Sequence, residues 1–395
     1  MSRKRMVATA AVLAGALVLT ACGGGGESAS SSGGGTAGGE TLKIGFMGDL
    51  TGENSGIVIP PRNGAKLAID EYNATNPAQK LELIEYDSQG SADQAVPLVT
   101  QAIQQDKIVA LIGPAFSGES KAAGPVLEQG GIPSISASAT NPGLAQNGWK
   151  FWHRVVANDN DQGPAIADFF IRVKSPTKAY VISDDQEYSV GLADAAFKQF
   201  QAKGIQVERD QFAQAASDYS STVAKVSAYQ PDVIVYGGYY AQAGRLLKQL
   251  RDSGVTATFA SGDGSFDPQV IQGAGAPAAE GAVFSCPCLV PEEGKETPAL
   301  ADFAKRYKAA NGGAAPAIYS GEGYDAATLF INAIKGGATT PDAINTALSG
   351  ATLDGVSKKI TFKENGEPDI NTVFMYQVQG GALKLLGESD QAALS

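Results

Sequence analysis

Short apolar runs alternate with segments of helical periodicity along the first third of the chain. Runs of this length bounded by turn residues indicate strands buried in a parallel sheet, and the periodic segments between them indicate amphipathic helices. The pattern predicts strands over 42–48, 81–86, 108–112 and 132–136, and helices over 63–72, 91–103 and 117–127. Pro97 falls inside the second of these helical patterns, which must therefore kink there or begin late.

A second alternating series follows a long connection through Trp149, Trp152 and Arg154. It predicts strands over 179–182, 205–207, 232–236 and 256–260 and helices over 192–200, 219–229 and 241–252. Beyond it we expect helices over 298–310, 323–334 and 341–348 and short strands over 359–362, 373–378 and 383–386. Strands that alternate with helices of this length indicate βαβ units. Because two such series exceed one typical core, the sequence predicts an α/β protein of two similar lobes.

The N-terminus has the features of an export signal. A basic start precedes an apolar core, Val7 to Leu19, that is too short to span a bilayer as a helix. The sequence LTAC at 19–22 resembles the lipobox of bacterial lipoproteins, in which the cysteine carries the lipid. We therefore expect a signal peptide over 1–21, a lipid on Cys22, a flexible Gly- and Ser-rich tether over 22–40, and an extracytoplasmic protein anchored to the cell membrane. A plain secretory signal is the alternative.

Charge and cysteine content argue against several classes of function. The formal net charge is -11, which argues against binding to nucleic acid and against electrostatic adhesion to anionic lipid. With Cys22 lipidated, Cys286 and Cys288 remain. A C-x-C bridge closes a small ring, yet two free thiols outside the cell would be unusual, and of the two we favour the disulfide. Two cysteines and the single His153 supply too few ligands for a structural zinc site, so we expect no metal and no cofactor.

Small polar residues collect at the ends of two neighbouring predicted strands. Ser117 follows the strand that ends at Gly113-Pro114, in the N-cap position of the next helix, and Thr140 follows the next strand. The carboxyl ends of parallel strands share one edge of the sheet, where open α/β sheets bind ligands. The positive end of the helix dipole at Ser117 favours a carboxylate or a phosphate. The alternative is that Ser117 only caps its helix and Thr140 only forms a turn.

Four motifs, together with the stretches around Ser117 and Thr140, resemble the branched-chain amino acid binding proteins of ABC importers, the leucine/isoleucine/valine type. The motifs are DQGP at 161–164, YSVGLA at 188–193, DYS at 218–220 and YGGY at 236–239. The resemblance implies a type I periplasmic-binding-protein fold, which is α/β with two Rossmann-like lobes joined by a three-segment hinge. Lobe 1 would comprise 41–157 and 285–366, and lobe 2 would comprise 158–284 and 367–390.

The resemblance also implies a ligand site between the lobes. Ser117 corresponds to the serine that holds the α-carboxylate of the ligand, and Asp263 falls where the family has an acidic partner for the ammonium. The remaining expected ligand contacts are Phe116, Ser138, Ala139, Thr140, Tyr188, Tyr239 and Tyr319. A zwitterion needs donors at one end and an anion at the other, and this set supplies both when the cleft is shut. The alternatives are a simple turn at Asp263 and a place in the lobe core for Tyr188 and Tyr239.

The implied function is that of an extracytoplasmic solute-binding lipoprotein. It would act as a monomer, capture an amino acid, by default leucine, isoleucine or valine, between closing lobes, and deliver it to the permease of an ABC importer. Ile57 stands where the family often has a cleft tyrosine, so another α-amino acid stays open. A short amide, urea or an aromatic acid as the ligand also stays open, as does presentation of the ligand to a sensory receptor. No nucleophile motif lies near His153, which argues against an enzyme.

Overall fold

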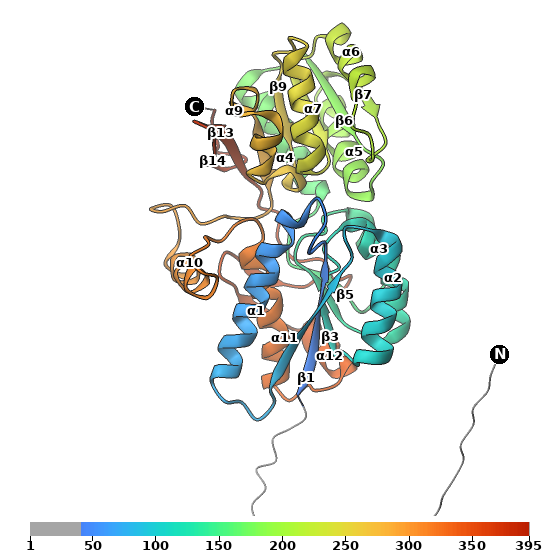
Figure 1. Cartoon of the computed structure of the whole chain (residues 1–395), viewed down its shortest axis with the longest axis vertical. Helices are drawn as coiled ribbons and strands as arrows, with labels where there is room; N and C mark the ends of the chain where they lie inside the picture. Colours follow the sequence, from blue (N-terminus) through green and yellow to red (C-terminus); the bar gives the residue numbers. More distant parts are fainter. Residues whose placement is uncertain (1–40, 395) are drawn as a thin grey trace, which may run out of the picture. The chain divides into compact units, whose positions relative to one another are not determined.

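A computed structural model describes residues 41–394, which form two α/β lobes, each built on its own β-sheet (Figure 1). The sheet of lobe 1 is parallel, with the strand order β2-β1-β3-β4-β5. Its strands are β1 (Leu42–Gly48), β2 (Leu81–Asp87), β3 (Ala110–Ile112), β4 (Ser134–Ser136) and β5 (Trp152–Arg154). The helices of this lobe are α1 (Ile59–Ala74), α2 (Ala92–Gln101), α3 (Ser117–Gly130), α10 (Pro298–Ala310), α11 (Ser320–Lys335) and α12 (Pro341–Ser349).

Lobe 2 holds the larger sheet, with the strand order β14-β13-β10-β9-β8-β6-β7. The pairs from β10 to β7 are parallel, whereas β13 is antiparallel to both β10 and β14. The strands are β6 (Lys178–Ser183), β7 (Gln206–Gln211), β8 (Val233–Gly237), β9 (Thr258–Ser261), β10 (Val283–Cys286), β13 (Phe374–Gln379) and β14 (Ala382–Glu388). The helices are α4 (Asp159–Lys174), α5 (Glu187–Ala202), α6 (Ser220–Tyr229), α7 (Tyr240–Asp252), α8 (Gln269–Ala274) and α9 (Ala276–Ala279). A separate ribbon pairs β11 (Thr352–Asp354) with β12 (Lys359–Thr361).

The central strands are apolar because helices cover both faces of the parallel sheets. Every residue of β8 is buried, and so is the continuous run Ile44 to Gly48 of β1. Helix α7 turns Leu246, Leu247 and Leu250 inward, and each is fully buried. Burial of one such side chain stabilises the fold by about 1.5–3 kcal/mol. The apolar runs of the sequence are therefore strands covered on two sides.

Two glycines let α1 and α11, which are far apart in the sequence, pack closely (Figure 1). A Cβ atom on Gly64 of α1 would lie 2.0 Å from the carbonyl oxygen of Ser320, and one on Gly323 of α11 would lie 2.1 Å from that of Pro61. Both distances are far shorter than van der Waals contact, so any side chain would push the two helices apart. The C-terminal third of the chain therefore completes lobe 1.

The predicted alternation of strands and helices is confirmed in both lobes. The first predicted strand coincides with β1, and the helix predicted to start at Pro341 is α12. Thr340 caps that helix as expected, with its hydroxyl oxygen accepting from the N–H of Ala343. Gly254, predicted to follow the end of α7, has a φ of +78°. Local turn and cap chemistry is thus a reliable guide to these ends.

One detail of the prediction is wrong, and one of two alternatives is excluded. Ser117 is the first residue of α3 and does not cap it; Phe116 occupies the N-cap position, and its N–H donates to Oε2 of Glu119 (3.0 Å). Helix α2 begins at Ala92, so Pro97 does not delay its start. The irregularity comes later, where residues Ala102–Asp106 continue α2 as a π-helix.

The sequence pattern missed one long helix. The pattern predicts a connection where α4 lies, although Ile166 and Phe170 stand at helical spacing and are fully buried. Gly163-Pro164 interrupts the apolar periodicity, which hides the helix. Its N-cap is Asn158, whose side-chain oxygen accepts from the N–H of Asn160 (2.9 Å). Strand β10, also missed, lies deep in the sheet of lobe 2.

The limits of the lobes, 41–157 with 285–366 and 158–284 with 367–390, remain a proposal. Cys286 still pairs with Phe374 in the sheet of lobe 2, so we propose that the second of the three segments that join the lobes begins after Cys286 and not at residue 285. The predicted signal peptide over 1–21, the tether over 22–40 and the lipid site at Cys22 lie outside the described residues. Within residues 41–394, no helix combines the length and the apolar character that crossing a membrane requires.

Candidate functional site

The loops that follow β3 and β4 are tied together by serine hydroxyls. Ser136 Oγ donates to the carbonyl oxygen of Pro114 (2.8 Å), and Ser138 Oγ donates to that of Ala115 (2.7 Å). Gly113, directly after β3, has a φ of +114°, and a Cβ atom there would lie 2.5 Å from a backbone carbonyl oxygen of β1. Only glycine suits that conformation and that space. Since the proton of Ser138 is used in this contact, the same hydroxyl can offer its oxygen as an acceptor.

Helix α3 begins at this edge, directly after the loop that follows β3. Ser117 Oγ accepts from the N–H of Asn141 (3.2 Å), so the serine acts as an acceptor in this contact and its own proton can point to a ligand. Thr140 is fully buried; its Oγ1 atom makes no well-aligned hydrogen bond within the described part of the chain, and its hydroxyl lies near enough to the Asp159 carboxyl group to lower the pKa of that group. The first N–H groups of a helix lack partners within it. This edge is therefore suited to an anion.

A buried ion pair holds the segment over 139–141 in place. Arg154 donates through Nη1 to the carbonyl oxygens of Ala139 (2.8 Å) and Asn141 (3.0 Å). Its Nε and Nη2 atoms bind the two carboxylate oxygens of Glu367, with 2.9 Å from Nε to Oε2. The N–H of Ala139 donates to Ser136 Oγ (3.0 Å), so the N–H and the carbonyl oxygen of Ala139 are both hydrogen-bonded within the protein.

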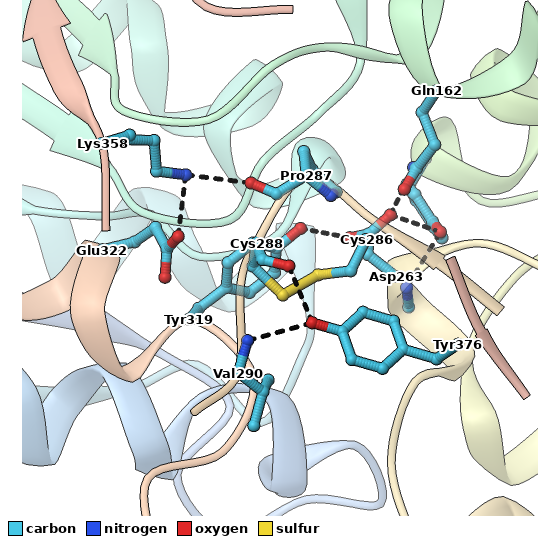
Figure 2. Close-up of a disulfide and its surroundings, with 12 residues drawn as sticks. Gln162, Asp263, Cys286, Pro287, Cys288, Val290, Tyr319, Glu322, Lys358 and Tyr376 are labelled. Atoms are coloured by element: carbon cyan, nitrogen blue, oxygen red, sulfur yellow. Dashed lines mark hydrogen bonds and ion pairs between the residues drawn. A yellow bond between two sulfur atoms is a disulfide. The ribbon is translucent and has the colours of Figure 1, made fainter. Parts of the chain in front are cut away.

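Asp263 provides a negative charge from lobe 2. It follows β9 and is only 3% exposed, so its segment is not an ordinary surface turn. Its carboxylate accepts from Gln162 Nε2 (2.6 Å), from the hydroxyl of Tyr188 (2.9 Å) and from the hydroxyl of Tyr319 (2.7 Å). Figure 2 shows Gln162 and Tyr319 reaching this carboxylate. Burial raises the pKa of Asp263 above its usual range, and the three hydrogen bonds oppose that rise.

Aromatic side chains from both lobes meet beside Asp263. The ring of Tyr239 lies 4.7 Å from that of Phe116 in lobe 1 and 5.2 Å from that of Tyr188 in lobe 2, centroid to centroid. Each ring is at least nine-tenths buried. Tyr188 also accepts, through its hydroxyl, from the N–H of Gly264 (2.9 Å). These tyrosines thus lie at the lobe junction, with Tyr188 fixed directly on the Asp263 segment.

Tyr319, from the C-terminal part of lobe 1, is a further aromatic residue beside Asp263. It precedes α11 and has a φ of +58°, a left-handed conformation that is uncommon for an aromatic residue. Its side chain is 1% exposed and ends on Oδ2 of Asp263. Strained backbone of this kind persists where surrounding contacts impose it and is frequent at ligand sites.

Further contacts join the lobes around the group. The ammonium of Lys121 lies 2.8 Å from Oε2 of Glu187, and Asn141 Nδ2 donates to the carbonyl oxygen of Glu187 (2.8 Å). On another element, Arg245 Nη1 pairs with Glu53 Oε1 at 2.6 Å. The structure therefore has the lobes in contact over the candidate site. The pairs at Lys121 and Arg245 are partly exposed, so each contributes about 0–1 kcal/mol.

Cys286, the last residue of β10, forms a disulfide with Cys288 (Figure 2). Both residues are buried. Lys358 Nζ from lobe 1 donates to the carbonyl oxygen of Pro287 (2.9 Å), and the hydroxyl of Tyr376 from β13 donates to that of Cys288 (3.1 Å). The segment that holds the disulfide is therefore tied to both lobes.

Three buried polar residues near the site were not assigned a role from the sequence. Glu119 accepts from Ser88 Oγ under the N-terminus of α3, and burial raises its pKa to about 7. Asp159 and Gln162, at the start of α4, lie beside Asp263. Gln162 belongs to the DQGP motif, so the sequence held a signal for it, whereas the missed helix hid Asp159. No group of three or more His, Cys, Asp or Glu side chains within 41–394 could hold a metal ion.

Known proteins resemble this chain in sequence and in fold. The family model of the periplasmic binding proteins matches residues 41–382. An amino acid binding protein of Pseudomonas aeruginosa is 31% identical over 237 residues, 59% of this chain and 63% of that protein. A leucine-, isoleucine-, valine-, threonine- and alanine-binding protein of the same organism is 28% identical over 334 residues, 83% of this chain and 87% of that protein.

A solved structure supports the same assignment. It is the substrate-binding protein of a branched-chain amino acid transporter from Streptococcus pneumoniae, in complex with isoleucine. The match has a TM-score of 0.80 and 25% identity, and it covers 88% of this chain and 100% of that chain. The predicted type I fold and the predicted resemblance to branched-chain amino acid binding proteins are thereby confirmed. The chain belongs to the periplasmic binding protein family, a family of solute-binding proteins.

Proposed function

We propose that this chain captures an α-amino acid, by default leucine, isoleucine or valine, between its lobes and, acting as a monomer, delivers it to the permease of an ABC importer. The observation that carries the proposal is a pair of opposite chemistries across the lobe junction. Lobe 1 offers the N-terminus of α3 with the hydroxyls of Ser117 and Thr140, and lobe 2 offers the buried carboxylate of Asp263. A zwitterion satisfies both at once.

Each side chain has a role in this proposal. The α-carboxylate lies against the first N–H groups of α3 and the hydroxyls of Ser117 and Thr140. The ammonium group lies against Asp263, with the oxygen of Ser138 as a further acceptor. The apolar side chain of the ligand is covered by the aromatic group of Phe116, Tyr188, Tyr239 and Tyr319. Ala139 borders the ligand without a free polar group of its own. The names of the relatives support the branched-chain default.

Uncharged ligands and aromatic acids fit this chemistry less well. Urea and short amides carry no charge, and an aromatic acid has no ammonium group, so each would leave the buried carboxylate of Asp263 without a cation. An unpaired buried charge costs about 1–3 kcal/mol or more. Presentation of the ligand to a sensory receptor would use the same closed lobes and remains the alternative to transport.

Saturating L-leucine, L-isoleucine or L-valine should raise the unfolding temperature of the soluble body, residues 41–394. A ligand present at a hundred times its dissociation constant adds about 2.7 kcal/mol to the free energy of unfolding. The measurement is a thermal-shift screen of all amino acids, with urea, acetamide and benzoate as controls. Stabilisation by a control compound, with no effect of any amino acid, would overturn the proposed ligand class.

We further propose that the protein is a lipoprotein held outside the cytoplasm by its N-terminus. Replacement of Cys22 with alanine should move it from the membrane fraction to the soluble fraction, because Cys22 would carry the lipid and the apolar core of the signal is too short to span a bilayer. Fractionation and metabolic lipid labelling measure this, with Ser28→Ala in the tether as the matched control. A Cys22→Ala protein that still pellets and still takes up lipid would show that the anchor lies elsewhere.

A further inference from the structure

A second carboxyl group, that of Asp159, lies in the same buried site as Asp263. Asp159 is the first residue of α4 and is 0% exposed, while Asp263 is 3% exposed. The amide nitrogen of Gln162 joins them, at 3.2 Å from Asp159 Oδ1 and 2.6 Å from Asp263 Oδ1. Figure 2 shows the Gln162 end of this contact. The N–H of Asp159 donates to the carbonyl oxygen of Thr140 (2.9 Å), so the pair also borders the edge of lobe 1.

The Asp159–Asp263 pair has no cation of its own. The positive charge of Arg154 lowers the pKa of Asp159 from a distance, but the guanidinium group itself is paired with Glu367. Among residues 41–394, no ion pair includes Asp159 or Asp263. The other groups that face the pair are neutral. Thr140 and Gln162 carry no charge, and burial keeps Tyr188, Tyr239 and Tyr319 protonated by raising the pKa of each. Two buried carboxyl groups thus share one site with hydrogen bonds but without an ion-pair partner in the described part of the chain.

Electrostatics favours one proton on this pair. Asp159 Oδ2 is buried and makes no well-aligned hydrogen bond in the described part of the chain, but the hydroxyl of Thr140 lies near enough to act on this carboxyl group. Burial first, and then the charge of Asp263, raise the pKa of Asp159 to about 8, against the opposing effects of Thr140, Arg154 and Gln162. The N-terminus of α4 favours the ionised form, but two carboxylates in one desolvated site repel each other more strongly than a helix end stabilises either. Near neutral pH the pair therefore retains a proton.

We propose that the ligand-free site holds one proton on the Asp159–Asp263 pair and that the ammonium group of the ligand replaces it. The O–H bond of the carboxylic acid breaks, the proton passes to water, and N–H donors of the ammonium take its place between two carboxylates. Asp159 is then a second anionic contact and selects for ligands that carry a cation. This inference rests on the proposed function, because it requires an ammonium group on the ligand.

The shared proton predicts that the affinity for the ligand rises with pH. A cation in contact with a carboxyl group lowers its pKa, so the pair binds fewer protons with ligand than without. Binding then releases up to about one proton, and affinity rises by up to about tenfold per pH unit until the free pair ionises near pH 8. If Asp159 cannot titrate, the affinity should be nearly flat over the same range.

The test is titration calorimetry of L-leucine at about pH 7 in phosphate and in Tris, whose different ionisation enthalpies reveal the number of protons exchanged. We expect the wild type to release close to one proton per ligand and Asp159→Asn to release close to none. Asp161→Asn is the matched control, since it removes a partly exposed carboxyl from the same turn of α4 and should behave as the wild type. Binding by the wild type without proton release would overturn the inference and leave the proposed function intact.

A second measurement needs no ligand and decides the case if L-leucine does not bind. A carboxyl that stays protonated in the fold but ionises in the unfolded chain makes the fold less stable as pH rises from its unfolded to its folded pKa. Urea unfolding from about pH 5 to pH 8 should therefore show the wild type losing stability relative to Asp159→Asn, by up to about tenfold in the folding equilibrium per pH unit. Parallel curves for the two proteins would refute the shared proton, whatever the ligand.

Discussion

Replacement of Asp263 with alanine should weaken the binding of L-leucine by about a hundredfold or more. In the closed site the ammonium group is desolvated, and leaving it without its main anion costs about 2–5 kcal/mol. The change also removes the acceptor for three donors, those of Gln162, Tyr188 and Tyr319. Asp263→Asn keeps the shape and loses the charge, and most of the affinity should be lost in this variant as well.

Calorimetry with L-leucine and with its deamino analogue, 4-methylpentanoate, measures the effect directly. The wild type should prefer the amino acid strongly, and Asp263→Ala should lose most of that preference. Ser117→Ala should weaken binding clearly less, because the N–H groups of α3 still hold the carboxylate. Asp267→Asn, a buried aspartate on the same segment, is the matched control and should keep the preference. Full discrimination by Asp263→Ala would place the ammonium partner elsewhere.

Replacement of Arg154 with methionine should lower the free energy of unfolding by about 3–5 kcal/mol, because it leaves Glu367 buried without its cation. The Arg154 side chain is fully buried and that of Glu367 is 10% exposed. The carbonyl oxygens of Ala139 and Asn141 lose their donor in the same step. The affinity for amino acids should therefore fall too, since the segment beside Ser117 is no longer held in place.

Urea unfolding of the ligand-free protein measures the loss of stability. The double variant Arg154→Met with Glu367→Leu should recover part of it, because removal of both charges leaves none unpaired. Lys66→Met breaks an exposed pair with Asp70 and should change the stability by less than about 1 kcal/mol. Equal losses for Arg154→Met and Lys66→Met would mean that the buried pair has no special role in stability.

Much of the fold follows from local sequence, and the exceptions have identifiable causes. Strands such as β1 and β8 are continuous apolar runs, which a parallel sheet requires. Helix α12 begins at Pro341, directly after Thr340. The side chain of Thr340 accepts from an N–H group at the helix start, and Pro341 has no N–H group that would need a partner. Helix α4 escaped prediction since Gly163-Pro164 breaks its apolar repeat, and packing in lobe 2 forms the helix nonetheless.

The candidate site was predicted from the sequence only in part. Ser117 was predicted from its place at the end of a buried strand as well as from the resemblance to a family, whereas Tyr188 and Asp263 came from the resemblance. The structure brings Tyr188 and Asp263 together. The role of Ser117 as a helix cap was wrong, because its oxygen is occupied by the N–H of Asn141, from a neighbouring loop. Asp159 could not be identified, because the sequence around it does not indicate that the carboxyl group of Asp263 lies nearby in the fold.

The sequence by itself determined the alternation of strands and helices, the division into two lobes and the residue types available at the sheet edges, because periodicity and turn chemistry act over a few neighbouring residues. Only the tertiary structure decided which polar groups meet. Gln162 and Asp263 are 101 residues apart, and Tyr319 and Asp263 are 56 apart. Folding removes these groups from water together, and this joint burial determines the protonation of the carboxyl groups in the site. No short segment of the sequence shows which groups are buried together.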